Sequence, residues 1–192
     1  MSFEINLQSD DNGLPIDGFI GYTSQGSQDG EIPRSSFYIS SEGQKTLFDE
    51  IKKDGIVVDL TTLKTGWGAY LGNGQPTDWK WNDSIKGPWI EQPGEEYKRG
   101  FSVLCMSGTK LLNWTQNGVA VMEALLLMSQ QCVDFDPDSG KLPLMKFTKV
   151  ETKKFKNGNS TSVPVLTLDK YVDRPFALDL DKKDEGVKNP EF

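Results

Sequence analysis

Aromatic and basic side chains are interleaved between residues 64 and 99 of the chain. Trp79 and Trp81 flank Lys80, and in an extended strand this spacing puts both indoles on one side, one repeat of about 6.6–7 Å apart. Single-stranded nucleic acids stack bases on exposed aromatic rings, at about 1–3 kcal/mol per base, while nearby cations contact phosphates. The alternative is that these tryptophans are structural and close one end of a barrel. We expect base stacking from Trp67, Trp79, Trp81 and Trp89, and phosphate contacts from Lys64, Lys80, Lys98 and Arg99.

A second basic segment spans residues 141–156, where six lysines accompany a single acidic residue, Glu151, for a local charge of +5. The turn signal Asn157-Gly158 follows, so the lysines are expected to flank a hairpin. Such a hairpin can follow a phosphate backbone, but lysines also keep an exposed hairpin soluble, and both interpretations stay open. The residues predicted to contact phosphate here are Lys146, Lys149, Lys153 and Lys154.

The net charge of −7 is concentrated at the two ends of the chain. Residues 1–60 carry −7 and residues 176–192 carry −2, whereas residues 61–175 carry +2. Exposed charges more than about 8–10 Å apart are largely screened at physiological salt, so a basic strip on an acidic protein can still bind phosphates.

The chain contains no histidine. This excludes Ser–His and Cys–His nucleophile pairs, histidine general bases and histidine-ligated zinc. We therefore expect a binding protein rather than an enzyme, with no cofactor and no metal. A nuclease that uses carboxylate-bound metal stays as a minor alternative, because the acidic residues available to it lack a recognisable spacing. Those residues are Asp78, Asp83, Glu91 and Glu95.

Cys105 and Cys132 lie in apolar contexts, which favours buried reduced thiols over a disulfide or a metal site. No apolar run approaches the roughly 18 residues that a membrane span needs. The first residues show neither the basic nor the apolar region of a signal peptide. We expect a cytoplasmic protein.

Hydrophobic periodicity and turn signals predict a mainly β fold with one buried helix, capped by Asn117, and one short N-terminal helix. The buried helix precedes the last two strands, and this order of elements is typical of a β-barrel of five or more strands that is OB-fold-like, the oligonucleotide-binding fold. Other small barrels and sandwiches stay open. Phe101 is assigned to the core. The predicted strands are 37–40, 56–63, 100–107, 142–150 and 163–172, and the predicted helices begin at Ser41 and span 118–131.

The chain is expected to divide into three parts: an N-terminal arm with the short helix packed on the barrel (1–55), the nucleic-acid-binding core (56–176) and an acidic tail (177–192). The tail is too polar to bury enough apolar surface to fold, so it is predicted to be disordered. Its terminal aromatic ring is then available as a hook for a partner. The residues assigned to docking are Asp179, Asp181, Asp184, Glu185, Glu191 and Phe192.

Several motifs occur in a characteristic order: Lys64-Thr-Gly-Trp-Gly68, Pro76-Thr-Asp-Trp-Lys-Trp81, Lys98-Arg-Gly-Phe101, Gly140-Lys-Leu-Pro143 and Tyr171-Val-Asp-Arg-Pro175. Over residues 60–176 the chain resembles the single-stranded DNA-binding proteins of tailed bacteriophages. The resemblance implies an oligonucleotide-binding barrel, sequence-nonspecific binding of single-stranded DNA in phage DNA replication or recombination, and residence in the host cytoplasm. It also implies that the tail docks a polymerase, helicase or primase, and it leaves homo-oligomerisation open. The alternative is a virion or host-takeover module that binds proteins and no nucleic acid.

Overall fold

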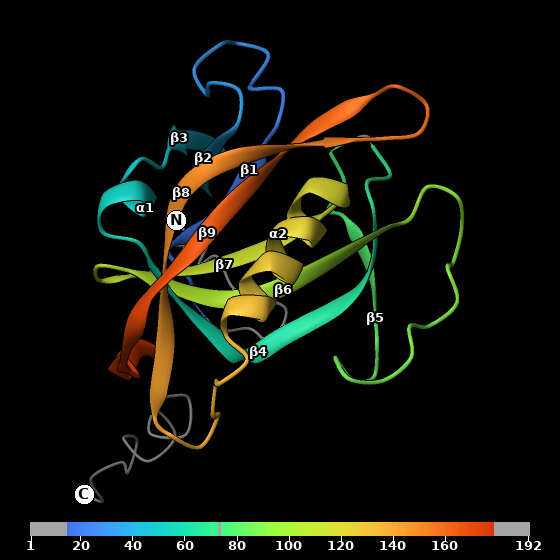
Figure 1. Ribbon diagram of the computed structural model, residues 1–192. Helices are drawn as coiled ribbons and strands as arrows, with labels where there is room; N and C mark the ends of the chain where they lie inside the picture. The colour runs from blue at the N-terminus through green and yellow to red at the C-terminus, as the bar shows by residue number, and fades with distance from the viewer. Residues whose placement is uncertain (1–14, 73, 179–192) are drawn as a thin grey trace, which may run out of the picture.

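The computed structural model describes residues 15–72 and 74–178, which form a mainly β structure built on one curled sheet, a partly closed barrel (Figure 1). Eight strands follow one another in the order β3-β2-β1-β7-β6-β4-β8-β9, and β5 is attached to β4. The strands are β1 (Gly18–Thr23), β2 (Ser36–Ser41), β3 (Gln44–Leu47), β4 (Ile56–Ala69), β5 (Asp78–Trp81), β6 (Lys98–Ser107), β7 (Lys110–Asn117), β8 (Lys141–Lys154) and β9 (Ser160–Asp173). The helices are α1 (Glu50–Lys53), α2 (Val119–Gln131) and the 3-10 turn η1 (Phe176–Leu178).

β4 organises the sheet because it pairs with three neighbours. Its first residues pair with β8, its last residues, 66–69, pair with β5, and β6 runs beside both halves. Between the halves the register with β6 shifts, and the Thr62 hydroxyl donates to the Asp59 carbonyl (2.8 Å) while it accepts from the Leu104 N–H (2.9 Å). This side chain replaces a missing rung of the ladder, so the strand bends without leaving polar backbone unpaired.

The core lies inside the curl and is centred on Trp114 of β7, which is fully buried. Phe37 and Phe101 meet its indole edge-on, with ring centroids 5.4 and 5.0 Å away. Edge-to-face aromatic pairs contribute about 0.5–1.5 kcal/mol each beyond the area they bury. The assignment of Phe101 to the core is confirmed.

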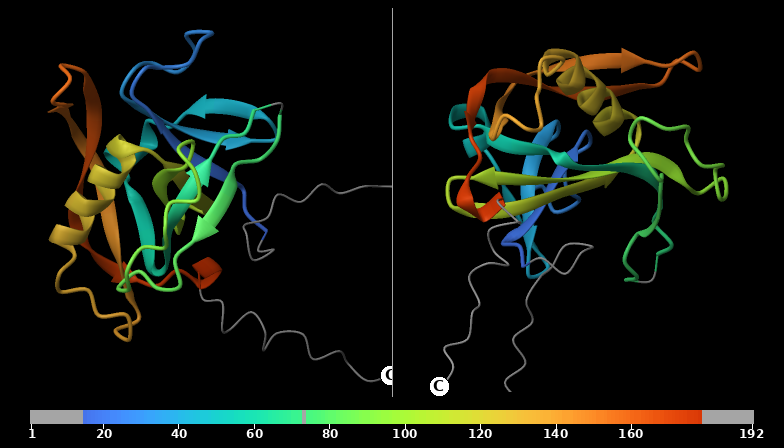
Figure 2. Two further views of the ribbon diagram at one scale, coloured as in Figure 1. Left: turned by 90° about the vertical axis from the view of Figure 1, so that its right-hand side faces the viewer. Right: turned by 90° about the horizontal axis from the view of Figure 1, so that it is seen from below.

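α2 is the predicted buried helix, and it lies against the β8–β9 hairpin (Figure 2). Leu125 and Met128 face the core. The predicted cap is wrong. Asn117 ends β7, and its side-chain amide donates to the Gly68 carbonyl at 2.6 Å. The N-cap is Gly118, whose φ of 113° is accessible to glycine and strained for other residues.

The predicted strands correspond to β2, β4, β6, β8 and β9, and the Asn157-Gly158 turn lies between β8 and β9 as expected. β1 and β7 were not predicted. β7 follows β6 through a two-residue turn at Gly108 and Thr109. β1 contains two glycines and lies in a stretch rich in glycine, serine, aspartate and asparagine, which weakens its strand signal. It pairs antiparallel with β2 and parallel with β7.

The predicted helix beginning at Ser41 is also wrong, because the chain forms a hairpin there. Ser41 of β2 pairs with Gln44 of β3, and the two turn residues Glu42 and Gly43 have φ of 51° and 78°. A two-residue turn with positive φ at both positions matches the twist of a hairpin. The helix that remains, α1, has four residues and buries Ile51.

Side-chain hydrogen bonds join β9, the last strand of the sheet, to β1 and to the residue before β2. The hydroxyls of Tyr22, on β1, and Ser162, on β9, share a hydrogen bond of 2.9 Å, and the Ser35 hydroxyl donates to Ser162 at the same distance. On the other side of β1, the Gln116 amide accepts from the Tyr22 N–H (2.9 Å) and donates to its carbonyl (2.6 Å). This amide extends the pairing of β1 with β7 by one further rung.

Cys105 and Cys132 are buried free thiols, as predicted. Burial raises the pKa of both thiols, so they remain protonated at neutral pH. Within the described part of the chain, no helix is long and apolar enough to cross a membrane.

The predicted docking residues of the tail, at positions 179–192, lie outside the described residues. The last described residue, Leu178, is 1% exposed and packs beside Ile16 and Leu142. Arg174 holds this end of the chain, because its backbone N–H donates to the Gly140 carbonyl (2.8 Å) and its guanidinium donates to the Leu178 carbonyl (3.2 Å).

Candidate nucleic-acid interface

The last part of β4, β5 and the connection from β5 to the start of β6 form an arm at one side of the sheet (Figures 1 and 2). We call it the aromatic arm (residues 64–72 and 74–100). It carries all the tryptophans that the sequence assigned to base stacking. Each of them is partly exposed, in contrast to the buried Trp114 of the core. These residues are Trp67, Trp79, Trp81 and Trp89.

Trp79 and Trp81 stack on each other. Their ring centroids are 4.5 Å apart and their planes differ by 4°. Both side chains project from the same face of β5, as the spacing predicts, but the rings have closed on each other to less than the repeat of the strand. Their inner faces are therefore occupied, and a base can stack only on the outer face of either indole.

Glycines on β4 and β6 make room for this pair. A Cβ atom at Gly68 would lie 2.8 Å from the ring of Trp79, one at Gly100 would lie 2.7 Å from it, and one at Gly66 would lie 3.0 Å from the ring of Trp81. Any other residue at these positions would collide with an indole. Gly66, Gly68 and Gly100 thus form a surface without side chains on which the two rings pack.

Trp67, Trp89 and Arg99 form a second cluster. The two indoles meet edge-on at 5.6 Å, and the Arg99 guanidinium carbon lies 5.4 Å from the centroid of Trp67 and 4.7 Å from that of Trp89. The Trp67 indole N–H donates to the Ile90 carbonyl at 2.9 Å, which holds the ring in place. The exposed guanidinium is thus positioned by cation–π contacts and keeps donors available for a phosphate.

The two clusters lie on opposite faces of β4. Trp67 and Gly68 are consecutive, so their side-chain directions alternate across the strand. Register places Arg99 and Lys80 beside Trp67, and Lys98 beside Gly68. Each face of the aromatic arm therefore combines indoles with at least one cation.

Side-chain hydrogen bonds hold the connection after β5 in place. The Asn82 amide donates to the Thr65 hydroxyl (2.9 Å) and accepts from the Ile90 N–H (3.1 Å). The Tyr97 hydroxyl donates to the Asp78 carboxylate at 2.5 Å. This hydrogen bond lowers the pKa of Asp78 and raises the pKa of Tyr97. The segment between β5 and β6 is thus held by side-chain hydrogen bonds at several points.

The lysines of β8 are largely engaged in ion pairs. Lys146 lies 3.4 Å from Asp169 of β9, Lys149 lies 2.7 Å from Glu151, and Lys153 pairs with Glu123 of α2. Lys154, at the end of β8, is exposed. Two of the three carboxylates come from other elements, so the local charge of +5 counted along the sequence overstates the charge on the surface. On the aromatic arm, Lys80 lies 3.1 Å from Asp78, and Lys64 is partly exposed on β4.

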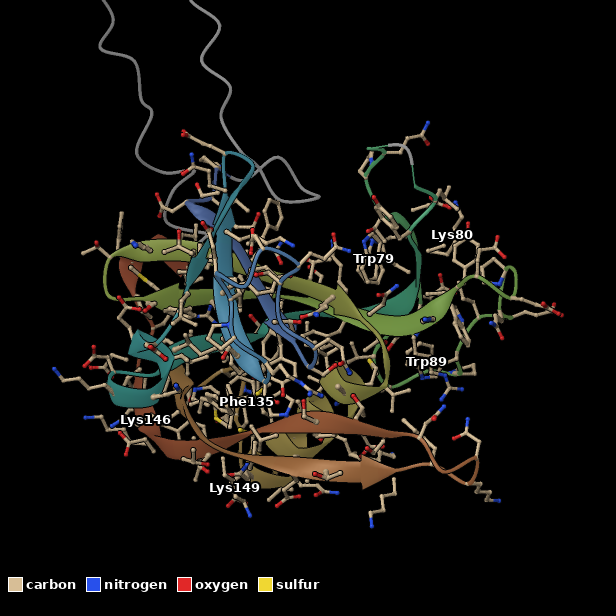
Figure 3. All side chains as sticks on the ribbon, turned by 90° about the horizontal axis from the view of Figure 1, so that it is seen from above. Trp79, Lys80, Trp89, Phe135, Lys146 and Lys149 are labelled. Atoms are coloured by element: carbon tan, nitrogen blue, oxygen red, sulfur yellow. The ribbon has the colours of Figure 1, made fainter. Side chains whose placement is uncertain are left out.

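The structure does not bring all predicted phosphate contacts together. β8 pairs with the first residues of β4, whereas β5 pairs with its last residues, and the strand between them is about 30–40 Å long. Figure 3 shows Lys146 and Lys149 on the side of the molecule opposite Trp79 and Lys80. The group gathered on the aromatic arm consists of Lys64, Lys80, Lys98 and Arg99 with the four tryptophans.

A cavity of about 380 Å³ separates the aromatic arm from the N-terminal hairpin. Trp79 lines it from the side of β5 that faces β1 and β2 (Figure 3), and Tyr38 of β2 and Lys45 of β3 line it as well. Burial raises the pKa of Tyr38. Sequence reasoning missed both N-terminal residues, because only the tertiary pairing of β1 with β7 brings them beside the arm.

A second cavity, of about 280 Å³, lies on the other side of Gln116 and Asn117, which line both cavities. Tyr22 of β1 and Phe155, beyond the end of β8, contribute to it. The end of the β8–β9 hairpin therefore borders the same surface of β7 as the aromatic arm. Together the two cavities reach from Trp79 to Phe155, the residue that follows Lys154.

No group of three or more histidine, cysteine, aspartate or glutamate residues within residues 15–72 and 74–178 is arranged to hold a metal ion. Comparison of the chain with protein-family models, with curated proteins and with solved structures gives no match.

Proposed function

We propose that this chain binds single-stranded DNA without sequence preference, through the aromatic arm and the adjoining surface of β7. The observation that carries the proposal is the arrangement of the arm. Four partly exposed indoles lie in two clusters, and one cluster holds the exposed Arg99 guanidinium between its rings. Exposed aromatic faces and cations side by side are what an unpaired strand needs, because its bases stack and its phosphates pair.

The path of the chain supports an oligonucleotide-binding barrel, which is the finer fold we propose. β4, β6 and β7 form an antiparallel meander, α2 follows, and β8 and β9 complete the set. β4 pairs with both the second and the fourth of these five strands and bends between the two pairings. In that barrel the ligand lies on the second and third strands, between the loops after the first and the fourth strands. Here those loops correspond to the aromatic arm and the end of the β8–β9 hairpin.

The proposed setting is a phage-type DNA replication or recombination system in the cytoplasm of the host. In that setting the acidic tail that ends in Phe192 would dock a polymerase, helicase or primase and compete with DNA for the cations. Removing the tail from Asp179 onward should then tighten DNA binding. Unchanged affinity of the truncated chain would remove the competition and leave the DNA-binding proposal intact.

The positions of the cations give this proposal a quantitative form. For single strands, log affinity falls with log salt concentration at a slope of about −0.7 per neutralised phosphate. The eight cations named from the sequence would give about −5.6, whereas Lys64, Lys80, Lys98, Arg99 and Lys154 alone would give about −3.5. Lys146 and Lys149 lie on the side of the molecule opposite the aromatic arm (Figure 3), so we expect the lower value.

The test is a titration of the protein with oligo-dT, followed by tryptophan fluorescence at a series of salt concentrations. Stacking should quench the emission of the arm at low salt, and added salt should reverse the quenching with a slope near −3.5. Absence of quenching at the lowest salt concentration would remove the proposal.

A second candidate, a protein-interaction module, is favoured by the apolar side chains on the outer face of α2. Val119 is 48% exposed, Leu126 is 51% exposed, and Val133 just beyond the helix is 77% exposed. Seven-residue spacing puts Val119 and Leu126 on one stripe of the helix, and Val133 lies two residues beyond its end. This candidate predicts a stable complex with one protein and no salt-dependent binding of oligonucleotides.

A further inference from the structure

The cavity between the N-terminal hairpin and the aromatic arm has an aromatic ring on each side and β7 between them. Its volume of about 380 Å³ is lined by Tyr38 on one side, Trp79 on the other and residues 115–117 of β7. The aromatic arm and β7 include no residue of β1, β2 or β3. The geometry of this cavity gives them a role.

Both rings rest on glycine. The Tyr38 ring lies across β1, where a Cβ atom at Gly21 would come within 2.3 Å of it, and the Trp79 ring lies over Gly68 and Gly100. In the sheet order, β7 runs between β1 and β6. β1 and β6, which carries Gly100, are thus two strand spacings, about 9.5 Å, apart, and β4, which carries Gly68, is one spacing further. A planar base that touches an aromatic ring on each face needs about 7 Å, given a stacking distance of about 3.4 Å.

We propose that this cavity holds one nucleobase of the bound strand between Tyr38 and Trp79, with the Lys45 ammonium beside the adjoining phosphate. The inference rests on the proposed function and assigns β1–β3 to the binding surface. A base that is still paired cannot enter, because its partner would have to follow it between the rings. The cavity therefore selects single strands over duplex.

Lys45 supplies the charge. Its ammonium lies 5.0 Å from the centroid of the Tyr38 ring, over the ring face. A cation held by the same ring that stacks a base is placed next to the sugar-phosphate of that nucleotide. Lys45 is exposed, so an incoming phosphate can reach it from solvent.

The floor of the cavity favours stacking over base reading. Both amide atoms of Gln116 bond to the backbone of Tyr22, and the Asn117 amide donates to Gly68. The Thr115 hydroxyl shares hydrogen bonds with the side chains of β6 and β7 beside it. Polar groups that are already paired gain little from a base edge. The cavity therefore accepts any base.

The experiment compares two substitutions of one residue. Tyr38→Leu removes the π face but keeps an apolar side chain over Gly21, whereas Tyr38→Phe keeps the ring. Phe176→Leu is the matched control, because Phe176 is 71% exposed, lies outside the aromatic arm and does not line the cavity. Affinity for a fluorescent oligo-dT is measured by anisotropy, which does not depend on the tryptophans. Ultraviolet cross-links between the wild-type protein and oligo-dT are mapped by mass spectrometry.

We expect Tyr38→Leu to bind about 5- to 140-fold more weakly, the equivalent of one lost base stack. Tyr38→Phe and Phe176→Leu should bind as the wild type does, and cross-links should map to Tyr38 or Trp79. If the Tyr38→Leu variant misfolds, the cross-links of the wild-type protein show whether a base lies between Tyr38 and Trp79. Wild-type affinity of Tyr38→Leu, or cross-links confined to other segments, overturns the inference and leaves the proposed function in place. Failure of the wild-type protein to bind oligo-dT overturns both.

Discussion

Replacing Arg174 with alanine should destabilise the protein, because it leaves Asp59 charged and buried without its partner. Asp59 has no exposed surface and sits where β4 bends. The Arg174 guanidinium donates to both of its oxygens, at 2.5 and 3.3 Å. Arg174 also bonds to the carbonyl of Leu178, so the same side chain fastens the C-terminal end of the fold to the bend in β4.

The size of the destabilisation depends on the hydrogen bonds that Asp59 keeps after Arg174 is removed. Removing one partner of a buried ion pair costs about 3–5 kcal/mol, because the remaining charge is uncompensated. Asp59 keeps the hydrogen bonds from the Thr61 N–H (3.1 Å) and hydroxyl (2.6 Å), and the Arg174 side chain is itself 20% exposed. Both features place the cost at the lower end, at about 3 kcal/mol. For a chain of this size each kcal/mol lowers Tm by about 2–4 °C, so we expect a decrease of about 6–12 °C.

The assay is urea unfolding followed by far-UV circular dichroism, with thermal unfolding beside it. Arg34→Ala is the matched control, because Arg34 is exposed and its side chain makes one hydrogen bond of 3.5 Å, to Gln25. The control should lie within about 0.5 kcal/mol of the wild type. An Arg174→Ala protein that unfolds at the same urea concentration as the control would refute the reasoning and show that the pair contributes nothing net.

Three further predictions concern the aromatic arm. Arg99→Ala should weaken oligo-dT binding and reduce the salt slope by about 0.7, whereas Arg99→Lys should keep the slope; salt titrations of both variants check this. The lowered pKa of Asp78 and the raised pKa of Tyr97 make their hydrogen bond stabilising between about pH 4 and pH 10, with the contribution lost as pH falls through the first pKa or rises through the second. Tyr97→Phe should therefore be less stable than the wild type at pH 7 and no longer differ from it once Asp78 is protonated, as unfolding at a series of pH values would reveal. Gly68→Ala puts a methyl group against the ring of Trp79, so the exciton signal of the stacked indoles in circular dichroism should disappear; its persistence would contradict the packing described above.

The sequence predicted what depends on local pattern. Alternation and turn residues marked β2, β4, β6, β8 and β9, and apolar content marked α2 as the helix that covers the sheet. The same reasoning failed where a residue's environment comes from elsewhere. The Ser41 region has helical spacing of apolar residues, yet its two turn residues adopt positive φ and form a hairpin. β1 lies in a stretch rich in glycine, serine, aspartate and asparagine, and its strand became evident only from its pairing with β2 and β7.

The candidate site shows the same division. Trp79 and Trp81 fell on one side of a strand as their spacing predicted, but their contact with each other and the glycine surface on which they pack depend on β4 and β6. The ion pairs of Lys146 and Lys153 were not predicted from the sequence. Glu123 and Asp169 neutralise lysines that lie 30 and 23 residues away in the sequence, and charge counts along the chain cannot register that. The sequence could not identify Tyr38 as a residue of the candidate site, because only the pairing of β1 with β7 brings it opposite the aromatic arm.

The most direct test of the central claim uses the indole N–H signals of the five tryptophans in a nitrogen-15 correlation spectrum. Trp114 is fully buried and serves as an internal control. On addition of oligo-dT at low salt, we predict that the indole signals of Trp79, Trp81 and Trp89 shift while that of Trp114 stays in place. If the indole signals of the aromatic arm do not move, or if only backbone signals of β8 respond, the arm is not the binding surface.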